Sequence, residues 1–189
     1  MNLAPMILAV AGIIIVIFVF MAIWAARYVK AGPNEVLIIS GRQRQLPDGR
    51  RLGFRWVRGG GTFVLPVVEK VELLSLEVIT IEMPKSQARA ANGERLMADC
   101  NAQAKIKGDD DSIVTAGEHF LSKRKEEIRE IVRRVLEKHL RTIVSRLSIE
   151  EISRDLEGPA SKVHAASSID LAKMGLELIS FTIENISPG

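Results

Sequence analysis

The sequence predicts an α+β fold preceded by a single N-terminal transmembrane helix, and three patterns support this prediction. Residues 3–26 are apolar and contain no Asp, Glu, Lys, Arg or His. Residues 35–106 include stretches in which apolar and polar residues alternate, as in β-strands with one buried face. Residues 112–174 show the spacing of amphipathic helices, and a final strand is expected at 176–186. We therefore expect helices to cover one side of a mostly antiparallel sheet.

The apolar segment 3–26 is long enough to cross a bilayer as one tilted helix. At a rise of about 1.5 Å per residue it reaches ~36 Å, against a hydrocarbon core of ~30 Å. Two alternatives stay open. A buried core helix would normally carry some polar residues, and a cleaved signal peptide has a shorter apolar region, of about 7 to 15 residues, after a basic start. The residues expected to anchor the chain include Leu3, Ile15, Phe18, Phe20, Trp24 and Ala26.

The charges that flank the apolar segment predict its orientation. Arg27 and Lys30 follow it, and cytoplasmic flanks are enriched in such residues. We expect the N-terminus outside the cell, the anchor in the inner (plasma) membrane and the rest of the chain in the cytoplasm. Trp24 and Tyr28 would then lie at the inner interface, where amphipathic rings are favoured.

The net charge of +3 hides an uneven distribution. Residues 27–58 hold eight Arg and Lys residues, with only Glu35 and Asp48 to oppose them. Anionic lipids of the inner leaflet are the expected partner, because each cation near that surface contributes roughly 1 kcal/mol. A solvated basic loop is the alternative. Nucleic acid is not expected, since no aromatic interleaving and no binding motif is present.

Residues 53–68 combine aromatic residues with three consecutive glycines, Gly59 to Gly61. A phosphate-binding loop is not favoured, because no Lys-Ser or Lys-Thr pair follows the glycines. The segment is either a strand, a turn and a strand of the core, or an aromatic tip that enters the membrane interface; the two do not exclude each other. The residues predicted to contact the leaflet are Arg27, Lys30, Phe54, Arg55, Trp56, Arg58 and Phe63.

A single amphipathic helix is expected after Ser122, which could cap it. Its apolar residues recur at spacings of three and four, and its other side alternates Arg and Glu. Pairs four residues apart stabilise such a helix by only tenths of a kcal/mol. The same charged side could meet a neighbouring copy, so we predict an oligomer interface at Arg124, Arg129, Glu130, Arg133, Arg134, Glu137 and Arg141.

No catalytic residue, metal site or cofactor is expected. Three adjacent carboxylates, residues 109–111, lack the spacing of a calcium loop and fit the start of a helix. His119, His139 and His164 have no partner at metal spacing. Cys100 lies on the apolar side of an alternating strand, as a small core residue in a reducing compartment. An enzyme acting on lipid is not favoured, because no nucleophile with an ordered His and carboxylate is visible.

Several ordered motifs resemble the flotillin branch of the SPFH or band 7 superfamily, which also includes stomatin, prohibitin, HflK and HflC. The resemblance covers residues 32–186. The motifs are GPNE at 32–35, GGTFVLP at 60–66, IEEI at 149–152, SIDL at 168–171 and ISFTI at 179–183.

This resemblance implies two SPFH subdomains, a membrane-proximal one at 32–93 and a second one at 94–187. It also implies a non-enzymatic scaffold that assembles into rings or cages, organises membrane microdomains and pairs with an NfeD-type membrane protein. A regulatory subunit that encloses or restrains a membrane protease, as in HflK, HflC or prohibitin, is the alternative. Flotillins continue into a long coiled coil, so we expect this sequence to be part of a longer protein. Lipidation is not expected, because no Cys lies near the membrane.

Overall fold

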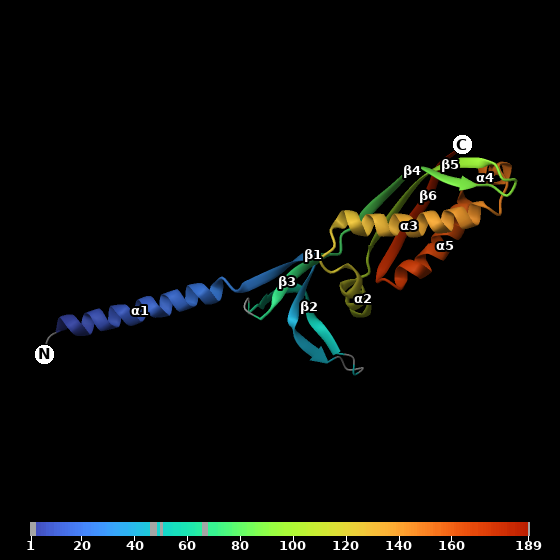
Figure 1. The fold of residues 1–189 in the computed structure, drawn as a ribbon. Helices are drawn as coiled ribbons and strands as arrows, with labels where there is room; N and C mark the ends of the chain where they lie inside the picture. The colour runs from blue at the N-terminus through green and yellow to red at the C-terminus, as the bar shows by residue number, and fades with distance from the viewer. Residues whose placement is uncertain (1–2, 46–48, 50, 66–67, 189) are drawn as a thin grey trace. The chain divides into compact units, whose positions relative to one another are not determined.

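A computed structural model describes residues 3–45, 49, 51–65 and 68–188, which fall into two compact units (Figure 1). The first unit, Met1–Leu74, holds α1 (Leu3–Ala25), β1 (Tyr28–Gln45), β2 (Arg51–Phe63) and most of β3 (Lys70–Ser75). The second unit, Ser75–Gly189, holds β4 (Ile79–Arg89), β5 (Arg95–Ile106), α2 (Asp110–Phe120), α3 (Lys125–Val144), α4 (Ile149–Arg154), α5 (Glu157–Ala172) and β6 (Leu176–Pro188). The predicted α+β class is confirmed.

The apolar N-terminal segment forms the helix α1. Its large apolar side chains at positions 7, 10, 13–21, 23 and 24 are 51–71% exposed, whereas the side chain of Leu3 lies outside the described set. Over the residues that are described, no helix combines the length and the apolar character needed to cross a membrane. The prediction that segment 3–26 is helical is therefore confirmed, but the prediction that it spans a membrane is not.

The first unit is built around β1, the central strand of a three-stranded sheet with the order β2-β1-β3. Its residues Val36 to Ile39 are almost completely buried, and Leu37 and Ile39 form a small core with Val64. The strand begins at Tyr28, earlier than the predicted Glu35, because Pro33 is accommodated where the β1–β2 register shifts. Gly41 is required for a different reason: its φ is +124°, and a Cβ there would collide with the carbonyl of Val68.

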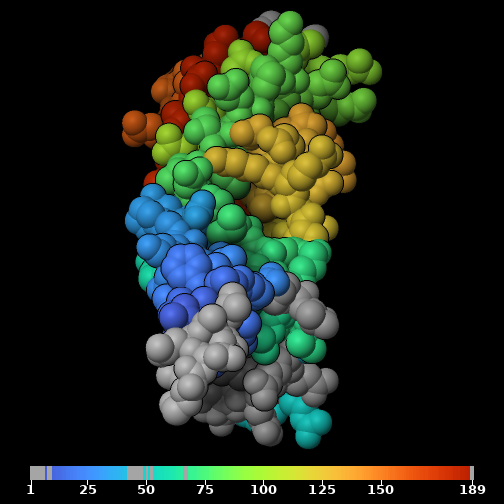
Figure 2. All heavy atoms as spheres, turned by 90° about the vertical axis from the view of Figure 1, so that its left-hand side faces the viewer, coloured from blue at the N-terminus to red at the C-terminus, as the bar shows by residue number. Residues whose placement is uncertain are grey.

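The second unit places α3 and α5 over one face of the antiparallel sheet β4-β5-β6 (Figure 1). Helix α3 packs on β4 and on α5, and α5 packs on β6. In Figure 2 the yellow atoms of α3 lie against the green atoms of β4. The alternation in β5 is confirmed, since its buried side consists of Leu96, Ala98, Cys100, Ala102, Ala104 and Ile106.

In residues 70–83 the alternation of apolar and polar residues slips by one position more than once, and the structure has a break in the strand there. Strand β3 ends at Ser75 and β4 begins at Ile79, so the segment is two strands. A bulge follows between Met83 and Ser86, where Lys85 adopts a φ of 51° and donates its backbone N–H to Asp99 over 2.8 Å. The side chains of β4 therefore return to the correct face after the bulge.

Local signals at the helix starts are partly confirmed. Asp109 caps α2 by accepting the N–H of Ser112 over 3.1 Å, and Ser148 and Glu151, which have the sequence spacing of a capping box, form one at the start of α4. The prediction that Ser122 caps the next helix is wrong, because Ser122 has a φ of 66° in the preceding turn. Helix α3 begins two residues later, after Arg124.

The boundary between the two units lies earlier than the sequence suggested. The predicted subdomains meet at residues 93 and 94, directly after the turn-forming pair Asn92-Gly93. In the structure Gly93 has a φ of 83° and lies between β4 and β5, which pair with each other on both sides of the bulge. Residues 93 and 94 therefore lie inside the second unit, which begins at Ser75.

Candidate functional site

An exposed group of aromatic rings lies where α1 passes into the first sheet. Phe20, Trp24, Phe63 and Tyr28 follow one another in space, with ring centroids 6.4, 5.3 and 5.1 Å apart. Trp24, Tyr28 and Phe63 are each more than 40% exposed. We call these four residues the aromatic junction. Such rings have an apolar body and, in Trp and Tyr, a polar handle, which suits the border between water and an apolar phase.

The strand pairing brings the aromatic junction together. Tyr28 lies opposite Phe63 in the β1–β2 pair, and the N–H of Val64 donates to the carbonyl of Arg27 over 3.2 Å. The Tyr28 ring crosses Gly61, where a Cβ would overlap the ring atoms. The third glycine of the triplet therefore leaves room for Tyr28, a role that the sequence pattern did not suggest.

Cations surround the aromatic junction, but they are not equivalent. Lys30 Nζ lies 5.9 Å from the centroid of the Tyr28 ring, within range of a cation–π contact. The Arg55 guanidinium donates to Thr62 Oγ1 and to the carbonyl of Phe63, each over 3.1 Å. It also pairs with Glu69 at 3.3 Å, so Arg55 serves the fold of the first unit.

The predicted leaflet residues divide into exposed and internal ones. Arg27, Lys30, Arg58 and Phe63 are exposed, and Trp56 is half-buried. Phe54 is only 8% exposed, because it lies opposite Ser40 on the inward side of β2. It is therefore a core residue and not one of the exposed members of the predicted leaflet set. Glu69, which holds Arg55, was missed by the sequence reasoning, because 14 residues separate them.

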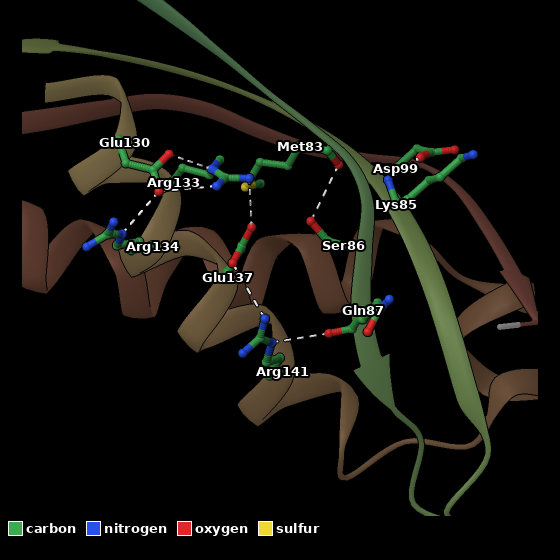
Figure 3. A network of polar contacts seen from close by, with 10 residues as sticks. All are labelled: Met83, Lys85, Ser86, Gln87, Asp99, Glu130, Arg133, Arg134, Glu137 and Arg141. Atoms are coloured by element: carbon green, nitrogen blue, oxygen red, sulfur yellow. Dashed lines mark hydrogen bonds and ion pairs between the residues drawn. The ribbon is translucent and has the colours of Figure 1, made fainter. Parts of the chain in front are cut away.

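The charged side of α3 forms a continuous series of ion pairs, drawn in Figure 3. Glu130 accepts from Arg133 at 2.9 Å and from Arg134 at 3.0 Å. Glu137 pairs with Arg133 at 3.4 Å and with Arg141 at 3.6 Å. We call these five residues the ionic ladder. The hydrogen bonds from Arg133 and Arg134 lower the pKa of Glu130, and the bond to Glu130 raises the pKa of Arg133.

The same helix also reaches the edge of the second sheet. Arg129 Nε donates to the carbonyl of Thr80, and Arg141 Nε donates to the carbonyl of Gln87, each over 3.2 Å (Figure 3 shows the second). Strand β4 is an edge strand, and unpaired backbone groups on such strands invite pairing with other chains. Arg129 and Arg141, predicted as interface residues, therefore bind this chain's own β4. Arg124 and Arg134, also in the predicted set, are largely exposed, at 79% and 75%.

The histidines and the cysteine have structural contacts. His139 and His164 hydrogen-bond to Asp170 and to the carbonyl of Leu178, and the His119 ring lies 6.1 Å from that of Phe120. Burial raises the pKa of the Cys100 thiol to about 12, with Asp99 and Glu184 adding to the shift. Among the described side chains, no group of three or more His, Cys, Asp or Glu residues is placed to hold a metal ion.

Comparison with known proteins defines the class to which this fold and these surfaces belong. The sequence profile described as "SPFH domain / Band 7 family" matches residues 29–189. The chain belongs to this family.

Within the family, the similar curated proteins are flotillins. The chain is 36% identical to the flotillin-like protein FloT of Bacillus subtilis over 96% of its own length and 36% of that protein. It is 34% identical to flotillin-1 of Drosophila melanogaster over 84% of its length, and 31% identical to human flotillin-1 over 82%. The chain spans about a third of the length of these relatives.

Proposed function

We propose that this chain is the membrane-anchoring part of a non-enzymatic, flotillin-like scaffold that assembles into homo-oligomers and organises membrane microdomains. The observation that carries the proposal is the continuity of α1 with the aromatic junction, so that an apolar helix leads directly into exposed rings and cations. The family and the flotillin relatives support a scaffold role.

Anchoring by α1 follows from the exposed apolar surface of that helix. Complete burial of one large apolar side chain is favourable by about 1.5–3 kcal/mol. Burial of the exposed Ile, Val, Phe, Met and Trp side chains of α1 in a bilayer would therefore contribute on the order of 10 kcal/mol or more. The proposed topology is a single pass through the inner membrane, with the N-terminus outside and the SPFH domain in the cytoplasm.

Contact of the first unit with the inner leaflet is supported by the exposed members of the predicted set. Phe63 and Trp24 present apolar rings, and Arg27 and Lys30 provide cations for anionic lipids. Rings at the interface and cations near the headgroups act together in this arrangement. The leaflet contact that we propose therefore consists of Arg27, Lys30, Arg58 and Phe63, with the half-buried Trp56 at its margin.

Contact between copies is proposed at the outward part of α3. Arg124 and Arg134 remain largely exposed, although each lies within ion-pair distance of a carboxylate on its own helix, Glu127 at 4.0 Å and Glu130 at 3.0 Å. Charges at the rim of an interface select the register and the partner more than they add affinity. Other copies and an NfeD-type membrane protein are the protein partners that we propose. The alternative of a protease-restraining subunit is not favoured, because the relatives named above are flotillins.

The anchor is tested by placing two charges in the middle of α1. The Ile15→Lys/Phe18→Lys variant should move the full chain from the membrane pellet to the supernatant after extraction with alkaline carbonate. Ile169→Lys is the matched control, because Ile169 is 63% exposed but lies on α5. Wild type and the control should remain in the pellet. Retention of the double variant in the pellet would refute the anchoring role of α1.

A further inference from the structure

A hollow of about 530 Å³ lies beside the aromatic junction, inside the first unit. The rings of Trp24 and Phe63 and the side chains of Val64 and Leu65 form its apolar walls. Arg27, Arg55 and Glu69 provide the polar part of the lining. This size and mixture of surfaces are those of pockets that bind small molecules, in which a few polar groups orient a mostly apolar ligand.

Two of the three charges in the hollow neutralise each other. Arg55 pairs with Glu69, whose side chain is only 8% exposed, and Glu69 Oε2 also accepts the N–H of Leu65 over 3.1 Å. The third charge, Arg27, has no carboxylate partner in the portion of the chain that the structure describes. A ligand in the hollow would therefore meet one uncompensated guanidinium.

The backbone also places residue 27 beside the hollow. Arg27 lies two residues after the end of α1, and its carbonyl is held by the N–H of Val64, itself a wall of the hollow. A guanidinium binds a phosphate through two parallel N–H donors, which gives both strength and orientation. The hollow thus offers a phosphate-binding group at one point and apolar walls around it.

We propose that this hollow binds one anionic phospholipid molecule, with Arg27 paired to its phosphodiester and with Trp24 and Phe63 packed against its glycerol and first acyl carbons. The inference rests on the proposed anchoring by α1 and adds to it a single lipid site. The lipid is favoured over free phosphate as the source of the anion, because free phosphate has no apolar part to cover the Trp24, Phe63, Val64 and Leu65 walls.

Native mass spectrometry of the full chain in detergent micelles tests the site by counting bound lipids. Phosphatidylglycerol is the anionic probe, phosphatidylcholine the zwitterionic one, and millimolar inorganic phosphate is the competing free anion. Wild type should retain one phosphatidylglycerol, and Arg27→Gln should weaken its binding at least tenfold. Arg51→Gln is the matched control, since it removes an equal charge from an exposed position of the same unit outside the hollow; its binding should stay within twofold of wild type.

The outcomes separate this site from the general leaflet contact. Equal weakening by Arg27→Gln and Arg51→Gln would overturn the single site and leave the anchor unaffected. Equal retention of phosphatidylcholine, or displacement of the lipid by inorganic phosphate, would also overturn it. Arg27→Lys keeps a cation and should retain most of the lipid. If this variant loses as much as Arg27→Gln, the charge is not what binds the lipid, and the proposal fails.

Discussion

His139 on α3 lies 2.9 Å from Asp170 on α5, from Nε2 to Oδ2, and so connects the two helices that cover the second sheet. Lys173 Nζ binds the other oxygen of the same carboxylate at 3.0 Å. The hydrogen bond from Lys173, followed by that from His139, lowers the pKa of Asp170 below its usual value. The carboxylate therefore favours the folded state in its ionised form.

Asp170→Asn should lower stability at neutral pH, and the difference from wild type should shrink on acidification. Because the pKa of Asp170 is lower in the folded than in the unfolded state, its contribution is present above the unfolded pKa, about 3.9. This stabilisation is lost as the pH falls through the pKa that Asp170 has in the folded state. Urea denaturation of the full chain at pH 7 and at several pH values below 4 measures the free energy of unfolding of the variant and of wild type. Glu118→Gln, on the exposed side of α2, is the control; a difference for Asp170→Asn that is the same at every pH would contradict the account.

Gly61→Ala should displace the Tyr28 ring and destabilise the first unit by about 1–3 kcal/mol, because the new Cβ would overlap that ring. Gly53→Ala is the matched control on the same strand, since nothing lies within 4 Å of a Cβ there. Thermal denaturation followed by tryptophan fluorescence compares the two variants. The Gly61→Ala/Tyr28→Ala variant should recover part of the loss. An equal melting temperature for Gly61→Ala and Gly53→Ala would show that Tyr28 does not occupy this position.

Cys100 should react slowly with a thiol reagent in the folded protein at pH 8. Burial raises the pKa of its thiol to about 12, so that the reactive thiolate is a very small fraction. Labelling with 5,5′-dithiobis(2-nitrobenzoic acid) in native buffer and in guanidinium chloride measures the rates. The unfolded chain should react at the rate of an ordinary thiol. Native and unfolded rates within a factor of two would contradict the buried position of Cys100 in β5.

Arg124→Glu/Arg134→Glu should reduce the size of the assemblies formed by the full chain in detergent. The side chains of these two residues are 79% and 75% exposed, so their reversal changes the outward surface of α3, and it also breaks the Arg134–Glu130 pair of the ionic ladder. Mass photometry gives the size distribution. Lys162→Glu reverses one exposed charge on α5 and serves as the control. An unchanged distribution for the α3 variant would remove this surface from the interface.

The sequence was sufficient to predict the features that depend on local periodicity. The alternation of residues 95–106, the apolar stripe of α3 and the Ser148–Glu151 capping box all arise from neighbours a few residues apart. The start of β1 and the cap of α3 were placed wrongly. The first error arose because Pro33 lies at a register shift inside β1, and the second because Ser122 lies in the turn before α3 with a φ of 66°.

The surfaces were predicted less completely, because their pairing depends on tertiary structure. The aromatic residues Trp24 and Phe63 were identified, but their contact with each other was not. The hydrogen bonds from Arg129 and Arg141 to the carbonyls of β4 span 49 and 54 residues of sequence. No periodic pattern could indicate that these cations are already bound within the chain; the interface itself stays a prediction.

The state of residues 3–26 in the mature protein tests the central claim most directly. The full chain is expressed in bacterial cells, membranes and soluble fraction are separated, and the intact mass of the protein is measured in each. The account predicts that the protein is recovered from the membrane fraction with these residues still attached. Recovery from the soluble fraction, with the first 26 residues removed, would contradict it.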